Sequence, residues 1–191
     1  KGDLWDSGKV VTDQSVHVEY AGKPLASRMQ CYWEVRVWDK DGKASDWSQQ
    51  ASWAMGLLKP EDWKAMWMGC KKGPSDIPDA TCPCFRKEFT TKGPVRRATI
   101  RATALGVMEL WLNGKRIGND FFMPGWTEYN KRLYYASYDV TALVRSGENC
   151  LGAILGDGWY GLHSGGRGKL RLKAQLEIEY ADGTSEVLPT D

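Results

Sequence analysis

The stretch LWLNGKRIG, residues 110–118, has the pattern of a β-hairpin. Its Asn113-Gly114 pair lies between two short extended runs, and this dipeptide supplies the positive φ angles that a tight two-residue turn requires. A hairpin joins neighbouring antiparallel strands, so the sequence around it is expected to form an antiparallel sheet.

Strand-like runs continue on both sides of this hairpin. The candidates lie at residues 84–91, 96–106, 107–113, 133–140, 149–156 and 171–180. Further turn dipeptides occur at Ser146-Gly147 and Asp182-Gly183. Because no long amphipathic helix intervenes, this spacing indicates an antiparallel β-sandwich. The expected fold class is therefore all-β.

The first 57 residues are also strand-like, but they contain fewer strands. Residues 16–20 (VHVEY) and 32–38 (YWEVRVW) alternate with period two. A turn signal at 39–42 leads to a further run through 52–54. About four short strands are too few for a two-sheet sandwich, which normally has seven. Either this block packs as an extra layer on the second domain, or strands from upstream complete it, and we favour the upstream strands.

A short connector separates the two blocks. Pro60-Glu61-Asp62-Trp63 places a proline and two acids where the first turn of a helix tolerates them. The sequence is thus divided into a first domain at 1–57, a connector at 58–65 and a second domain at 66–191.

The composition is that of a folded globular protein. Of the 191 residues, 42% are hydrophobic and 12% aromatic, whereas disordered chains are poor in aromatics. The 26 basic and 24 acidic residues give a net charge of +2 without long runs of one sign, which does not favour nucleic acid as a partner. No apolar stretch approaches the roughly 18 residues that span a bilayer. Neither nucleic acid nor a membrane is therefore an expected partner.

The five cysteines do not form a recognisable metal motif. Cys82-Pro83-Cys84 lacks the two-residue spacer typical of zinc sites. Cys31 and Cys150 have apolar or aromatic neighbours and are expected to fill a core. The cysteine content does not decide the redox compartment.

Two aromatic loops are the best candidates for a binding site. The first follows the hairpin and includes Trp126, and the second, residues 156–161, includes Trp159. Aromatic faces stack on the C–H faces of sugar rings, while neighbouring polar groups bind the hydroxyls. The candidate sugar-binding residues are Asn119, Asp120, Trp126, Asp157, Trp159 and Arg167. The alternative is that both tryptophans close the open end of the sandwich or pack on an adjacent domain.

Asn119 and Asp120 are also the candidate metal ligands. Their two adjacent side-chain oxygens are plausible ligands of a calcium ion, which takes six to eight ligands in all. The alternative is that the pair forms a plain turn. A glycosidase needs two carboxyl groups roughly 5–10 Å apart across the scissile bond. Sequence spacing does not pair Asp120, Glu128 and Asp157 in this way, so no catalytic residue is assigned.

Several motifs, taken in order, resemble bacterial α-L-rhamnosidases of glycoside hydrolase family 78. They include WDSGKV at 5–10, YWEVRVWD at 32–39, NGKRIG at 113–118, PGWTEY at 124–129 and GDGWY at 156–160. The resemblance covers nearly the whole chain and concerns the N-terminal, non-catalytic region of that family.

The resemblance implies a fold and a role for each part. Residues 1–57 resemble the later strands of a fibronectin-type-III-like domain, and residues 66–191 resemble the jelly-roll-like N-terminal sandwich, which is similar to carbohydrate-binding modules. The family's catalytic unit is a downstream (α/α)6 barrel that hydrolyses terminal α-L-rhamnose with inversion. This segment is therefore expected to be inactive by itself.

The implied partners are a rhamnose-containing carbohydrate and the downstream catalytic domain of the same polypeptide. In some relatives the sandwich is a calcium-dependent rhamnose-binding module whose Asp-Asn pair would fall, in reversed order, on Asn119 and Asp120. The loop after Tyr160 is shorter here, so the expectation is either no cofactor or calcium at this pair. The role expected is help in rhamnose recognition, and the alternative is a structural spacer that buttresses the barrel. The resemblance favours the bacterial periplasm or exterior over the cytoplasm. An unrelated cell-surface adhesion domain is the third possibility.

Overall fold

The computed structural model describes residues 2–70, 82–163 and 169–191, and it confirms an almost entirely β fold. The chain forms two compact units, Lys1–Asp62 (unit 1) and Trp63–Asp191 (unit 2). The division between them lies inside the connector expected at 58–65.

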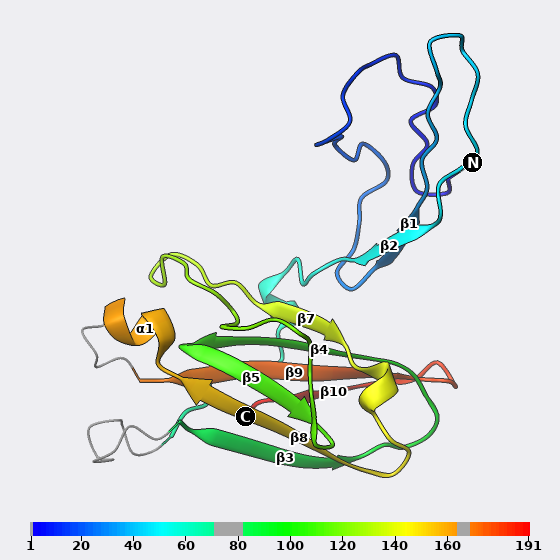
Figure 1. Ribbon diagram of the computed structural model, residues 1–191. Coiled ribbons are helices and arrows are strands. Elements are labelled where there is room, and N and C mark those ends of the chain that lie inside the picture. The colour runs from blue at the N-terminus through cyan, green and yellow to red at the C-terminus, as the bar shows by residue number, and fades with distance from the viewer. Residues whose placement is uncertain (1, 71–81, 164–168) are drawn as a thin grey trace. The chain divides into compact units, whose positions relative to one another are not determined.

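Unit 2 is a sandwich of two four-stranded antiparallel sheets, shown in Figure 1. Its strands are β3 (Cys84–Thr90), β4 (Val95–Leu105), β5 (Val107–Leu112), β6 (Lys115–Arg116), β7 (Ala136–Asp139), β8 (Glu148–Gly156), β9 (Arg171–Tyr180) and β10 (Ser185–Pro189). The sheet orders are β10-β9-β4-β7 and β3-β8-β5-β6. Successive strands repeatedly change sheet, which produces the jelly-roll-like arrangement. Short helices also occur at Thr141–Leu143 (η3) and Gly158–His163 (α1).

The core of unit 2 lies between the two sheets. On β4, alanines alternate with Ile100 toward the core, and every second residue from Ala98 to Ala104 is fully buried. Ile100 pairs with Leu176 of β9, while Leu112 and Leu155 face them from the other sheet and are also fully buried. Small alanine side chains allow the facing strands to approach closely. All six expected strands of this sandwich are present, with bounds shifted by at most three residues.

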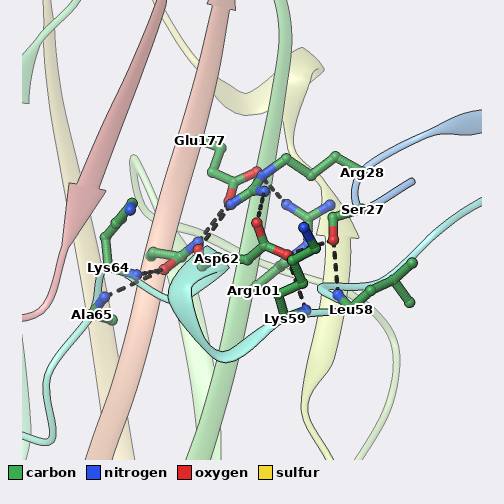
Figure 2. Close-up of polar contacts among 10 residues, drawn as sticks. Ser27, Arg28, Leu58, Lys59, Asp62, Lys64, Ala65, Arg101 and Glu177 are labelled. Carbon is green, nitrogen blue, oxygen red and sulfur yellow. Dashed lines mark hydrogen bonds and ion pairs between the residues drawn. The ribbon is translucent and has the colours of Figure 1, made fainter.

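The opposite face of the same sheet is buried as well, and it is polar. Arg101 is 1% exposed, and its Nη1 donates to Glu177 Oε2 at 2.5 Å. Gln175 Nε2 donates to Glu177 Oε1 at 2.6 Å, and Gln175 Oε1 accepts from the backbone N–H of Lys64 at 2.8 Å and of Ala65 at 3.3 Å. Figure 2 shows Arg101 and Glu177 together with Lys64 and Ala65. This chain of hydrogen bonds holds the first residues of unit 2 against the outside of its sheet.

Unit 1 contains a two-stranded hairpin, β1 (Gln30–Trp33) and β2 (Ala51–Ala54), and a 3₁₀ turn η1 (Pro60–Asp62). The ladder continues past the assigned strands, because Val35 and Val37 accept backbone hydrogen bonds from Ser48 and Ser45 at 2.8 and 2.9 Å. The turn expected at 39–42 is present, with a Gly42 N–H to Asp39 oxygen distance of 3.0 Å.

The prediction of a strand at residues 16–20 is wrong. No strand is assigned there, and His17 has a φ of +56°, which interrupts the extended backbone. Alternation of apolar residues predicts a strand only if a neighbouring strand is available to pair with it. Within the described part of unit 1, this segment has no such neighbour.

The C-terminal end of unit 1 is held by Asp62. Its carboxylate accepts from Ser27 Oγ at 2.5 Å and from Arg28 Nη1 at 2.9 Å, residues that Figure 2 also shows. These hydrogen bonds lower the pKa of Asp62 to about 2. Asp62 therefore stays ionised at neutral pH and keeps the start of the connector attached to unit 1.

Candidate functional site

The two aromatic loops of unit 2 meet in the structure. The Phe122 ring, after the β5–β6 hairpin, contacts the Trp159 ring of α1 edge to face, with centroids 5.8 Å apart. Tyr129 and Tyr160 make a second such contact at 5.2 Å. The expected hairpin turn is confirmed by φ angles of +54° at Asn113 and +78° at Gly114.

Large aromatic surface is exposed where the loops meet. Phe122 is 66% exposed and Trp159 38%, and the neighbouring Phe121 and Trp126 are 70% and 60% exposed. We call these four residues the aromatic rim. Exposed aromatic side chains, two of them here joined by the Phe122–Trp159 contact, are typical of binding or interaction sites.

The polar residues predicted to bind sugar do not share one environment. Asp120 Oδ2 accepts a hydrogen bond from the Tyr138 hydroxyl at 2.9 Å, so one oxygen of this carboxylate faces β7. The Asp120 backbone oxygen accepts from Arg116. Asn119 and Asp157 are exposed. Arg167 lies outside the described residues.

Arg116 and Tyr138 are part of the site and were missed from sequence. The Arg116 guanidinium lies 4.6 Å from the centroid of the Phe121 ring, and its Nη1 donates to the Gly118 oxygen at 3.0 Å. Its Nη2 also forms an ion pair with Glu109 Oε1 at 3.5 Å. Arg116 thus supports the loop that carries both Asp120 and Phe121. In the sequence, Arg116 was recognisable only as a positive charge at the end of the hairpin, and this feature does not by itself indicate a binding site.

Tyr138 reaches Asp120 because of its register. It pairs with Ile100 on β4, so its side chain lies on the face of that sheet that looks toward the other sheet. Gly118 packs on it: a Cβ atom there would lie 2.5 Å from the Tyr138 ring, which requires a residue without a side chain. A small hollow adjoins this contact, lined by Met108, Glu109, Leu110, Arg116, Ile117, Asp120, Met123 and Tyr138.

The ionisation of Tyr138 gives a test of this contact. Burial, followed by the hydrogen bond to Asp120, raises the pKa of Tyr138 from 10 to about 12. A raised pKa in the folded state means that the contribution of Tyr138 to stability is complete below pH 10 and is lost as the pH rises toward 12. We expect tyrosinate absorbance to show a step near pH 12 that Tyr138→Phe removes and Asp120→Asn shifts to lower pH. A step that stays unchanged in Asp120→Asn would contradict the contact.

The residues present do not fit a calcium site. Asn119 and Asp120 supply two side-chain groups, and one Asp120 oxygen is already bonded to Tyr138. Across residues 2–70, 82–163 and 169–191, no group of three His, Cys, Asp or Glu side chains could hold a metal ion. Calcium takes six to eight oxygen ligands, and the side chains of Asn119 and Asp120 supply only part of such a set. The same described ranges contain no helix long and apolar enough to cross a membrane.

Two families match the chain. Residues 93–191 match the family described as the alpha-L-rhamnosidase N-terminal domain, and residues 1–59 match the Rha78A-like N-terminal immunoglobulin domain. An α-L-rhamnosidase of Alteromonas sp. (strain LOR) is 41% identical over 99% of the chain, and one of Formosa agariphila is 37% identical over 99%. The chain spans 22% of the length of each of these relatives.

Solved structures show the same relationship. The α-L-rhamnosidase from Dictyoglumus thermophilum is 35% identical, with a TM-score of 0.88 over 100% of this chain and 23% of its own. The Streptomyces avermitilis enzyme, solved in complex with L-rhamnose, is 26% identical, with a TM-score of 0.84 over 99% of this chain and 35% of its own. The match of residues 93–191 and the sandwich that they form show that the chain belongs to the α-L-rhamnosidase N-terminal domain family.

Proposed function

We propose that this chain is an accessory part of an α-L-rhamnosidase that assists recognition of rhamnose-containing glycans through the aromatic rim. The observation that carries the proposal is the contact between Phe122 and Trp159, which joins two loops from distant parts of the sequence into one exposed aromatic surface. In the parent polypeptide, a catalytic domain downstream hydrolyses the terminal α-L-rhamnose.

The chemistry of the rim suits a deoxy sugar. Rhamnose carries a methyl group where most hexoses carry a hydroxymethyl, so one part of its surface is apolar and stacks on aromatic rings. Asn119 and Asp157 are exposed and offer hydrogen-bonding groups to the hydroxyls. The Asp120 oxygen not bonded to Tyr138 is a further acceptor, and Arg167 is a proposed donor. The relative from Streptomyces avermitilis, solved with L-rhamnose, supports the choice of sugar.

Binding by such an open surface is expected to be weak, around the millimolar range that corresponds to roughly −4 kcal/mol. Trp159→Ala removes one half of the ring contact and should abolish binding that is detectable in an NMR titration with L-rhamnose. Trp47→Ala is the control, because Trp47 is an exposed tryptophan (56%) in unit 1 that is not part of the aromatic rim, and this variant should bind as the unmutated chain does.

The polar part of the proposal is tested in the same titration. Asp120→Ala is expected to cost about 1.5–3 kcal/mol, which also moves binding out of range. Repeating the titration with calcium chloride tests whether the metal contributes. Sugar binding that survives both the Trp159 and the Asp120 substitutions would eliminate the rim as the site. No binding by the unmutated chain would instead support a spacer that packs on the catalytic domain.

A further inference from the structure

Two positive charges and two tryptophan rings are stacked on the surface of unit 1. The Arg36 guanidinium lies 4.9 Å from the centroid of the Trp38 ring and 4.6 Å from that of the Trp47 ring. The Lys9 ammonium lies 5.3 Å from the same Trp38 centroid. We call these four residues the cationic stack. It joins side chains from three separate segments of unit 1 into one surface.

The backbone next to Arg36 is fixed to the segment that carries Trp47. Val35 donates its N–H to Ser48 Oγ at 3.1 Å and accepts from the Ser48 N–H at 2.8 Å. Because these two residues adjoin Arg36 and Trp47 in sequence, the bonds hold the guanidinium close to the indole. A planar guanidinium that is already stacked loses little further freedom when it binds a ligand.

Neither cation of the stack has an acidic partner in residues 2–70, 82–163 and 169–191. Within these ranges, the side-chain nitrogens of Arg36 and Lys9 form no ion pair and donate no hydrogen bond to the protein. Glu34 lies two residues before Arg36, yet its Oε1 accepts from Gln50 Nε2 at 3.5 Å instead. Two positive charges beside one ring repel each other. An anion bound there would relieve this repulsion.

The cationic stack is open to solvent. Arg36 and Lys9 are exposed, and Trp47 is 56% exposed. Stacking covers the flat faces of a guanidinium but leaves the N–H groups at its edge free to donate. The stack therefore presents hydrogen-bond donors, positive charge and uncovered indole surface side by side.

We infer that the cationic stack is a second binding site, which takes the carboxylate of an acidic sugar, a uronate, in a glycan chain. The planar fork of N–H groups on Arg36 matches the two oxygens of a carboxylate, and Lys9 adds a second positive charge. The exposed part of Trp47 packs on the C–H face of the sugar ring. A peptide rich in aspartate or glutamate supplies the charge but not the flat apolar face. The site is independent of the aromatic rim, because it lies in unit 1 and requires a charged ligand.

An NMR titration of the chain with a trisaccharide of galacturonic acid tests this site. The indole N–H signals of Trp38 and Trp47 report on it directly. We expect saturable shifts in the millimolar range, as for other small exposed sites. Raising sodium chloride from about 0.05 M to about 0.5 M should weaken binding about three-fold or more, because salt screens exposed charges.

Two further ligands decide which chemistry is recognised. The trisaccharide of galactose has the same size but no carboxylate, and it should bind at least about ten-fold more weakly. Equal binding of the two trisaccharides would overturn the inference. A triglutamate peptide that binds as tightly as the uronate would also overturn it, since the sugar ring would then contribute nothing.

Substitutions locate the binding on the cationic stack. Arg36→Gln should abolish the saturable shifts, and Arg36→Lys, which keeps the charge but lacks the planar fork, should weaken binding about five-fold. Lys9→Gln lies outside the assigned strands, so it tests the stack even if the Arg36 variants unfold, and it should weaken binding about two- to three-fold.

Lys40→Gln is the matched control for Lys9→Gln. It removes the same charge from the turn of the hairpin, where the Lys40 side chain is 90% exposed and belongs to no ring contact of the stack. Binding should be the same as that of the unmutated chain. A loss as large as that of Lys9→Gln would show a general attraction between charges and overturn the site, as would tight binding that survives Arg36→Gln.

Discussion

Arg101→Ala is expected to lower the free energy of unfolding of unit 2 by about 3–5 kcal/mol. The side chains of Arg101 and Glu177 are 1% and 10% exposed and pair at 2.5 Å. Removing the guanidinium breaks an ion pair whose two side chains are shielded from water. Breaking a buried pair by removing one partner costs far more than losing an exposed pair. Urea unfolding followed by far-UV circular dichroism measures it.

The same two strands provide the control. Arg96 of β4 pairs with Glu179 of β9 at 2.5 Å, but its side chain is 66% exposed. Water solvates both groups of this pair, so Arg96→Ala should cost less than about 1 kcal/mol. Equal losses in the two variants would show that water reaches Arg101. An Arg101→Met, Glu177→Leu double substitution should recover part of the loss, because it removes both buried charges at once.

Leu155→Ala is expected to cost about 2.5–5 kcal/mol in the same measurement. Leu155 is fully buried between the sheets and lies opposite Met108 in the β5–β8 ladder. The substitution removes buried methyl groups and leaves a cavity that the two rigid sheets cannot close.

Ile154→Ala is the control for the core. Ile154 is the preceding residue of β8, faces the other side of the sheet and is 39% exposed. Its side chain leaves no enclosed cavity when shortened, and the loss should be about 1 kcal/mol or less. If Ile154→Ala costs more than Leu155→Ala, the register of β8 is wrong, because a shift by one residue exchanges the two faces.

Local sequence patterns determined most of the sandwich. Asn113-Gly114 requires a tight turn whatever surrounds it, and the structure has that turn. The long strands β4, β8 and β9 were also predictable, because each is apolar enough to be recognised within its own length. β10 was missed because Ser185–Pro189 is short and has little alternation.

At the candidate site, the sequence identified the aromatic loops but not the residue that binds Asp120. Trp126 and Trp159 were recognisable as unusual residues in glycine-containing loops, and both are exposed. The partner of Asp120 was not recognisable. Tyr138 lies 18 residues away on a strand of the other sheet, and only the packing of the two sheets brings its hydroxyl to the carboxylate.

Tertiary structure also decided which side chains are buried. By alternation, Arg101 and Glu177 belong to the outer face of the sheet and would be expected in water. They are buried instead, and the backbone of Lys64 and Ala65 bonds to Gln175 beside them, more than a hundred residues away in sequence. In unit 1, residues 16–20 have the alternation of a strand, but no strand among the described residues pairs with them, and they form none. Periodicity reports which face of a strand is apolar, whereas burial and pairing depend on which distant segment lies against it.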